Sequence, residues 1–228
     1  MKNFKTLYLF ICLFFCGTFI FAQTTKFNVT FSSGVSNSAI NNSVFTSPAF
    51  KNNFGWTNSV TVQYNFEKII NLKTGIAYES KIVYDVLLTR CEDFCVPQEQ
   101  KYTQQLNYLT IPLTIEAVFG KRLKYFFNVG TYFSKLITSK PINTFNNPYF
   151  IADDAREYKN YDFGLSVGFG IKIQVGKNLS IPIVISQSQS LVSNPRHAGY
   201  TFQPDLGPES LNTRNITVGL SYSFGNRK

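Results

Sequence analysis

Hydrophobic and polar residues alternate with a period of two along most of this chain. The longest run covers residues 161–175, where every second residue is large and apolar and the residues between are mostly Gly, Ser, Asp and Lys. Such alternation predicts a strand, because successive side chains of a strand point to opposite faces. Eight such segments follow one another, beginning near residues 27, 60, 72, 109, 127, 161, 179 and 215, and beyond the first 22 residues no helical period occurs.

The connections between these segments alternate in length. Residues 67–71, 120–124 and 176–178 are short turns, whereas the other four connections run to roughly 20 residues and are rich in Asn, Ser, Pro and Gly. Short turns at one end and long loops at the other are typical of outer-membrane barrels. We therefore predict an all-β fold, an eight-stranded antiparallel up-and-down transmembrane β-barrel. An even strand number brings both termini to the short-turn side, which is periplasmic in such barrels.

The two faces of the strands indicate which one meets lipid. One face carries Phe, Tyr, Ile and Leu, and the other is mostly Gly, Ser, Thr and Asn instead of Lys and Glu. Small residues suit the interior of a narrow barrel, and aromatic residues at strand ends suit a membrane interface. These aromatic residues are Phe66, Phe119, Phe127, Tyr222 and Phe224. We predict that the apolar face contacts lipid; the alternative is a soluble, lipocalin-like barrel with its apolar face inside.

The first 22 residues have the three parts of a secretory signal. Lys2 and Lys5 precede an apolar stretch over residues 7–21, and Ala22 follows. We expect residues 1–22 to be a cleaved signal peptide and residues 23–228 to form one barrel domain; a retained anchor and a lipoprotein modified at Cys16 are the alternatives. The chain has a net charge of +9. Export and the lack of a Lys/Arg cluster interleaved with aromatics argue against nucleic acid as a partner.

Several charged residues fall on the predicted inward face. They are Lys73, Glu79, Lys81, Glu116, Asp162 and Lys172. Buried charges need partners or water. One hypothesis is an ion-paired plug that fixes the register of the strands, and the other is a path for protons or ions. Because an eight-stranded barrel leaves little room for a channel, we do not predict a porin.

The loops contain the remaining candidate chemistry. Cys91 and Cys95 are expected to form a local disulfide in an oxidising compartment, with two free thiols as the alternative. They lack further zinc ligands, since the single histidine, His197, is remote in sequence. Ser193, His197 and Glu209 share one long loop, which allows the alternative of a lipid-modifying hydrolase. We predict instead a protein that is not an enzyme and has no cofactor or metal.

The segments YLTIPLTIEAVFG (residues 108–120) and NITVGLSYSFG (residues 215–225), together with Ala22-Gln23, resemble the PorT-like outer-membrane β-barrel family of Bacteroidetes-type bacteria. The resemblance implies an integral outer-membrane protein that the outer-membrane assembly machinery inserts. It also allows a part in protein secretion or gliding machinery. We therefore predict a structural or partner-binding role, in which long extracellular loops bind an extracellular or secretion-system protein.

Overall fold

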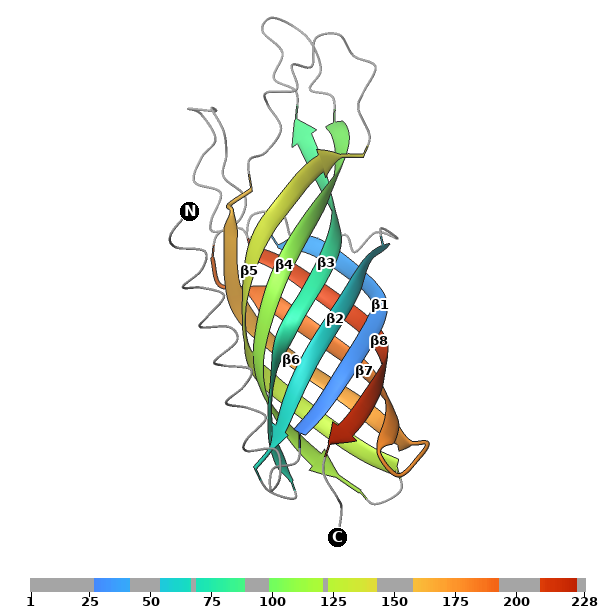
Figure 1. Ribbon diagram of the computed structural model, residues 1–228. Coiled ribbons are helices and arrows are strands. Elements are labelled where there is room, and N and C mark those ends of the chain that lie inside the picture. The colour runs from blue at the N-terminus through green and yellow to red at the C-terminus, as the bar shows by residue number, and fades with distance from the viewer. Residues whose placement is uncertain are drawn as a thin grey trace, which may run out of the picture.

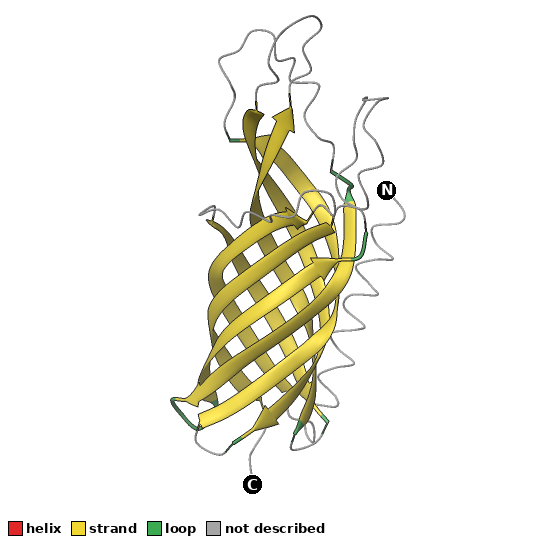
Figure 2. Ribbon diagram, turned by 180° about the vertical axis from the view of Figure 1, so that it is seen from behind, coloured by secondary structure: helices red, strands yellow, loops and turns green. Residues whose placement is uncertain are grey.

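Eight antiparallel strands close into a single barrel, and their order around the barrel is their order in the sequence (Figures 1 and 2). The computed structural model describes residues 27–41, 54–66, 69–88, 99–120, 123–142, 158–192 and 210–224. The strands are β1 (Phe27–Asn41), β2 (Phe54–Asn65), β3 (Ile70–Leu88), β4 (Glu99–Phe119), β5 (Leu123–Pro141), β6 (Tyr161–Gln174), β7 (Leu179–Ser190) and β8 (Ser210–Phe224). The predicted fold class is confirmed.

The barrel is closed by the pairing of its first and last strands. Phe27 at the start of β1 lies opposite Phe224 at the end of β8, and the ladder continues to Asn41 and Ser210. No edge strand therefore remains with unpaired backbone groups along this seam, as a membrane-spanning barrel requires. The seam also brings the described ends of the chain to the same end of the barrel as the three short turns, at the bottom of Figure 1.

Strands β3, β4 and β5 extend beyond the other strands at the opposite end (Figure 1). β3 continues to Leu88 and β4 begins at Glu99, so the connection between them is about half as long as the sequence pattern predicts. The prediction was wrong because apolar residues such as Val83 and Leu106 occupy the otherwise polar face here, so the alternation that marks a strand is weak. The ladder nevertheless runs on, with Leu88 opposite Glu99.

The outer wall of the barrel is apolar and the inner wall is polar. The outward residues of β4, β5 and β6 between the barrel ends are half exposed, including Ile111, Val129 and Leu165 at 50% each. The inward residues Thr110, Asn128 and Asp162 are at least nine-tenths buried. The alternative of a soluble barrel with an apolar interior at this level is therefore wrong. Among the residues that the structure describes, no helix is long and apolar enough to cross a membrane.

One irregularity interrupts the wall. Between β4 and β5 the register shifts after Asn107, so that Tyr108 lies opposite Leu136 while Asn107 lies opposite Thr138. Ile137 is thus an extra residue on β5, a β-bulge, and its side chain is 49% exposed. A bulge bends and twists its strand, and this one lies where β5 passes from the barrel wall into its extension.

Candidate functional site: the charged interior and its apolar cap

The structure places all six candidate charged residues on the inner wall. β3 provides Lys73, Glu79 and Lys81, β4 provides Glu116, and β6 provides Asp162 and Lys172. They form two groups separated along the barrel axis. An upper group contains Glu79, Lys81 and Asp162, and a lower group, nearer the short turns, contains Lys73, Glu116 and Lys172. The formal charges of these six side chains, three cations and three carboxylates, sum to zero.

The upper group is centred on an ion pair that is largely buried. The Lys81 Nζ lies 3.2 Å from Glu79 Oε2, and the two side chains are 1% and 12% exposed. The same ammonium group lies 4.9 Å from the ring centre of Tyr108 and 5.6 Å from that of Tyr132. A buried cation gains from such aromatic faces because their quadrupole partly replaces lost hydration. Lys81 is therefore held by one carboxylate and two rings from neighbouring strands.

Asp162 belongs to the upper group but binds neutral donors. The Tyr132 hydroxyl donates to Asp162 Oδ2 at 3.1 Å, and the Ser190 hydroxyl donates to Oδ1 at 2.5 Å. Asp162 is completely buried. Hydrogen bonds to an ionised carboxylate are stronger than neutral ones, so both oxygens of this group are stabilised without a direct cation. Tyr132 links the two halves of the group, since its ring faces Lys81 and its hydroxyl binds Asp162.

The lower group joins four strands. Lys172 Nζ lies 3.6 Å from Glu116 Oε1 and donates to Gln63 Oε1 at 3.4 Å. The Asn71 amide donates to the same Glu116 oxygen at 3.4 Å. Lys73 lies directly opposite Gln63 across the β2–β3 ladder and so belongs to the same level. These contacts connect β2, β3, β4 and β6 across the inside of the barrel.

Neutral hydroxyl groups fill the space beside the charges. Thr110 donates to Glu79 Oε2 at 3.3 Å and shares a hydrogen bond of 2.8 Å with Ser134. On the far wall, Thr30 donates to Ser221 at 2.9 Å. Much of the described inner wall is thus a bonded polar network. No group of three or more His, Cys, Asp or Glu residues in this part of the chain is arranged to hold a metal ion.

An apolar cluster lies above the upper group and was missed by the sequence analysis. It consists of Val83, Leu106, Tyr108, Tyr158 and Leu211, with Ile40 and Leu136 packed against it. These residues come from β1, β3, β4, β5, β8 and the segment before β6, and the first five are 0–8% exposed. We call this cluster the apolar cap. In the sequence, the cap is marked by Val83, Leu106 and Leu211, which are apolar residues at positions where the period of two predicts an inward polar side chain.

The other candidate site residues lie outside the described residues. Cys91 and Cys95 fall between β3 and β4, and Ser193, His197 and Glu209 fall between β7 and β8. The disulfide therefore stays a prediction, and the geometry of a hydrolytic triad is not part of the structure described.

The closed barrel with an apolar outer wall defines a membrane-spanning β-barrel. Comparison with protein families agrees: residues 21–194 match the outer membrane protein beta-barrel domain family. The chain belongs to this family and is an integral protein of the bacterial outer membrane. The comparison with curated protein sequences finds no match.

Two solved structures are similar in fold. Neisserial surface protein A (NspA) has a TM-score of 0.50 at 8% identity, with 86% of this chain and 96% of that chain covered. OprG from Pseudomonas aeruginosa has a TM-score of 0.50 at 8% identity, with 90% and 98% covered. At this level of identity the similarity shows a common barrel fold and nothing about a shared ligand.

Proposed function

We propose that this protein is a small, non-porin and non-enzymatic barrel that binds an extracellular or secretion-system protein through its extended end. One observation carries the proposal: two ion pairs and neighbouring hydrogen bonds cross the interior, and the apolar cap lies above the upper group. An apolar cap above a bonded, charged network interrupts a polar route for solutes along the barrel axis. We therefore expect the binding function at the end of the barrel where β3, β4 and β5 extend (Figure 1).

The proposal places this extended end outside the cell and both termini in the periplasm. Its support is the arrangement of connections, with short turns at one end and longer segments at the other. Loops on a rigid scaffold are the usual carriers of binding function. Membership of the PorT-like subgroup, insertion by the assembly machinery and a part in secretion or gliding belong to the same proposal.

Two measurements test the closed interior and the orientation. Purified protein in planar lipid bilayers should give no conductance steps above the bare membrane, and regular steps would contradict a non-porin role.

For orientation, single cysteines replace Lys140 at the extended end or Lys177 in a short turn, in a chain lacking Cys91 and Cys95. A membrane-impermeant maleimide should label residue 140, and not residue 177, on intact cells. The opposite pattern would reverse the orientation.

Partner binding is tested with a photo-crosslinking amino acid. It replaces Lys140, which is exposed on the extension, or Val129, which is half exposed on the lipid-facing wall of the same strand. Irradiation of intact cells should give a discrete protein adduct from residue 140 and none from residue 129. Equal adducts from both positions, or none from either, would contradict a protein partner at the extended end.

A further inference from the structure

An asparagine interrupts the apolar outer wall on β2. Asn58 is exposed on the outward face, between the apolar residues Trp56 and Val60 of the same strand. Across the ladders it lies opposite Ser33 on β1 and Tyr78 on β3. The side chains of Asn58 and Ser33 make no hydrogen bond with any residue that the structure describes. Within the described part of the chain, the amide of Asn58 therefore leaves both its donors and its acceptor unused.

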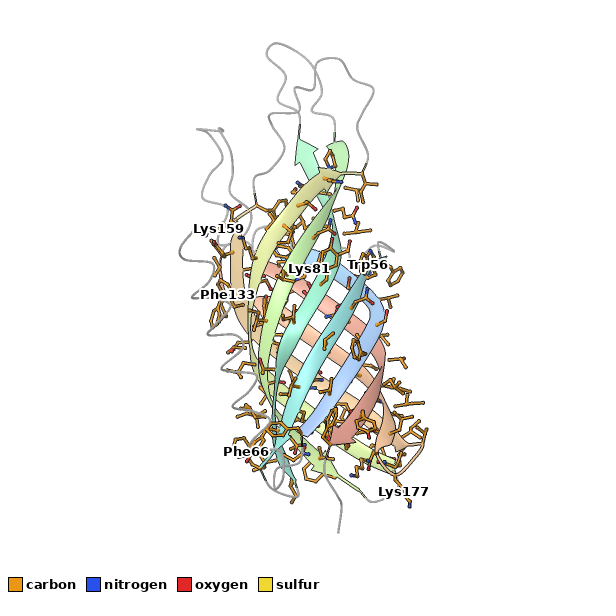
Figure 3. The ribbon with its side chains drawn as sticks, in the orientation of Figure 1. Trp56, Phe66, Lys81, Phe133, Lys159 and Lys177 are labelled. Carbon is orange, nitrogen blue, oxygen red and sulfur yellow. The ribbon has the colours of Figure 1, made fainter. Side chains whose placement is uncertain are left out.

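Aromatic residues place Asn58 within the apolar layer of the membrane. The rings of Trp56 and Tyr78 have centres 5.1 Å apart, and those of Tyr64 and Phe66 have centres 4.5 Å apart. Figure 3 shows Trp56 toward the extended end of the barrel and Phe66 at the short-turn end. Such rings prefer the two membrane interfaces. The nine residues 56–64 match the span of about 9–11 that a tilted strand needs to cross the apolar layer.

A second polar residue of the same wall shows how the barrel can satisfy such a group by itself. Thr74 lies on the outward face of β3, opposite Val62, and its hydroxyl donates to the Pro112 carbonyl at 2.9 Å. Asn58 has no such bond, and hydrocarbon chains offer neither donors nor acceptors. An unpaired amide in hydrocarbon costs free energy. Asn58 therefore favours a neighbour that brings hydrogen-bonding groups into the membrane.

The wall around Asn58 is hollowed. Ser33 and Asn58 are the polar members of the outward side chains that line the hollow, and a ring of apolar residues completes it. Phe31, which also lines the hollow, is 63% exposed, more than any other large apolar side chain that the structure describes. This surface thus combines a polar hollow with a protruding aromatic ring. The outward side chains that line it are those of Phe31, Ser33, Asn58, Val60, Tyr78 and Val218.

We propose that β1 and β2 bind a second copy of this chain, in a symmetric dimer whose two-fold axis passes close to Asn58. Two copies inserted in the same direction are related by an axis along the membrane normal, so residues near the axis meet their counterparts at the same depth. An amide both donates and accepts, so the two Asn58 side chains exchange a pair of hydrogen bonds. The small Ser33 lets the walls approach closely, and Phe31 of each copy packs against the other.

Self-complementarity favours a second copy as the occupant of this surface. Polar side chains that bond across an interface and small residues that allow close approach both stabilise association in membranes. An acyl chain would fill the hollow but leave the amide unpaired, whereas a second copy brings an amide at the matching depth. The surface belongs to strands that do not extend beyond the barrel. The inference therefore goes beyond the proposed function and does not depend on which end faces outward.

Self-association of the mature chain, folded into detergent micelles, tests the dimer by sedimentation equilibrium. The wild type should show a monomer–dimer equilibrium, and N58V should dimerise at least tenfold more weakly because the reciprocal hydrogen bonds are lost. T131V is the matched control. It also replaces an outward polar residue by valine, but on β5, where Thr131 lies opposite Leu113 and Leu165. T131V should dimerise like the wild type.

Disulfide crosslinking in native membranes locates the contact. Single cysteines replace Asn58 on β2 or Val167 on β6 in a chain lacking Cys91 and Cys95. Both residues are exposed on the outward face, and their strands are four apart in the order around the barrel. A mild oxidant should give a covalent dimer from N58C and none from V167C.

The outcomes separate this proposal from the proposed function. A monomeric wild type, equal dimerisation of N58V and the wild type, or equal covalent dimers from N58C and V167C would overturn the dimer. A product of N58C that contains a different protein in place of a second copy would overturn the proposed occupant. Heat-dependent mobility on gels verifies that each variant is folded. The conductance, labelling and photo-crosslinking results at the extended end do not affect this comparison.

Discussion

The ring of Tyr132 on β5 covers the backbone of Gly164 on β6. A methyl group at residue 164 would lie 2.5 Å from the Tyr132 hydroxyl oxygen, 2.6 Å from its Cε1 and 2.1 Å from the carbonyl oxygen of Gln189. The two residues are direct partners in the ladder. Glycine is required here because only a hydrogen atom leaves room for the ring. The ring in this position reaches Asp162 with its hydroxyl and faces Lys81, so one glycine orients the upper charged group.

Gly164→Ala is therefore expected to displace Tyr132 and destabilise the barrel. Overpacking of this kind costs about 1–3 kcal/mol, and loss of the hydrogen bond to Asp162 adds to it. The measurement is urea unfolding of protein folded into lipid vesicles. Gly176→Ala is the matched control, because the nearest atom to its added methyl group, Leu179 Cβ, lies 3.6 Å away. Equal stability of the two variants would show that Tyr132 is not held by Gly164.

The Lys81–Glu79 pair should behave as a structural unit. Lys81→Met leaves Glu79 without its cation in a buried site and is expected to destabilise the barrel by about 3–5 kcal/mol. Replacing both residues, as Lys81→Met with Glu79→Gln, removes the isolated charge and should restore part of that loss. A double-mutant cycle from the same unfolding experiment gives the coupling. Additive effects of the two substitutions would contradict a stabilising pair and favour the alternative hypothesis of an ion path.

The lipid-facing wall and the bulge should differ in their tolerance of charge. Val129 and Ile137 lie on β5 and are 50% and 49% exposed. Val129→Lys introduces a charge into the apolar wall and should cost about 2–4 kcal/mol in a bilayer, whereas Ile137→Lys, at the level of the headgroups, should cost about 0–1 kcal/mol. Folding free energies in vesicles measure both. A similar cost for the two would contradict a membrane boundary that lies between Val129 and Ile137.

The predicted disulfide between Cys91 and Cys95 is tested by thiol alkylation. In membranes prepared without reductant, both sulfurs should be bonded to each other. The mature protein should therefore react with a maleimide only after treatment with dithiothreitol. Intact-mass measurement counts the added groups and reports the two hydrogens gained on reduction. Reaction of both cysteines before reduction would favour the free thiols.

The amino-acid sequence by itself determined the number of strands, their order and the face on which most of their residues lie. Period-two alternation assigns Lys73, Glu79, Lys81, Glu116, Asp162 and Lys172 to the interior, and the structure places all six there. The short turns predicted at 67–71, 120–124 and 176–178 required neighbouring strands to be antiparallel. These features are local, because parity and turn length depend only on residues close in the chain.

Only the tertiary structure decided which of these residues meet. The period of two assigns each residue to a face but does not give the register between strands. It therefore does not predict that Lys172 contacts Glu116 or that Tyr132 lies between Lys81 and Asp162. The apolar cap was also hidden, since Val83, Leu106 and Leu211 look like isolated exceptions to a polar face until closure of the barrel brings them together. The physical cause of the cap is that β3, β4 and β5 extend beyond the other strands and need an apolar core of their own.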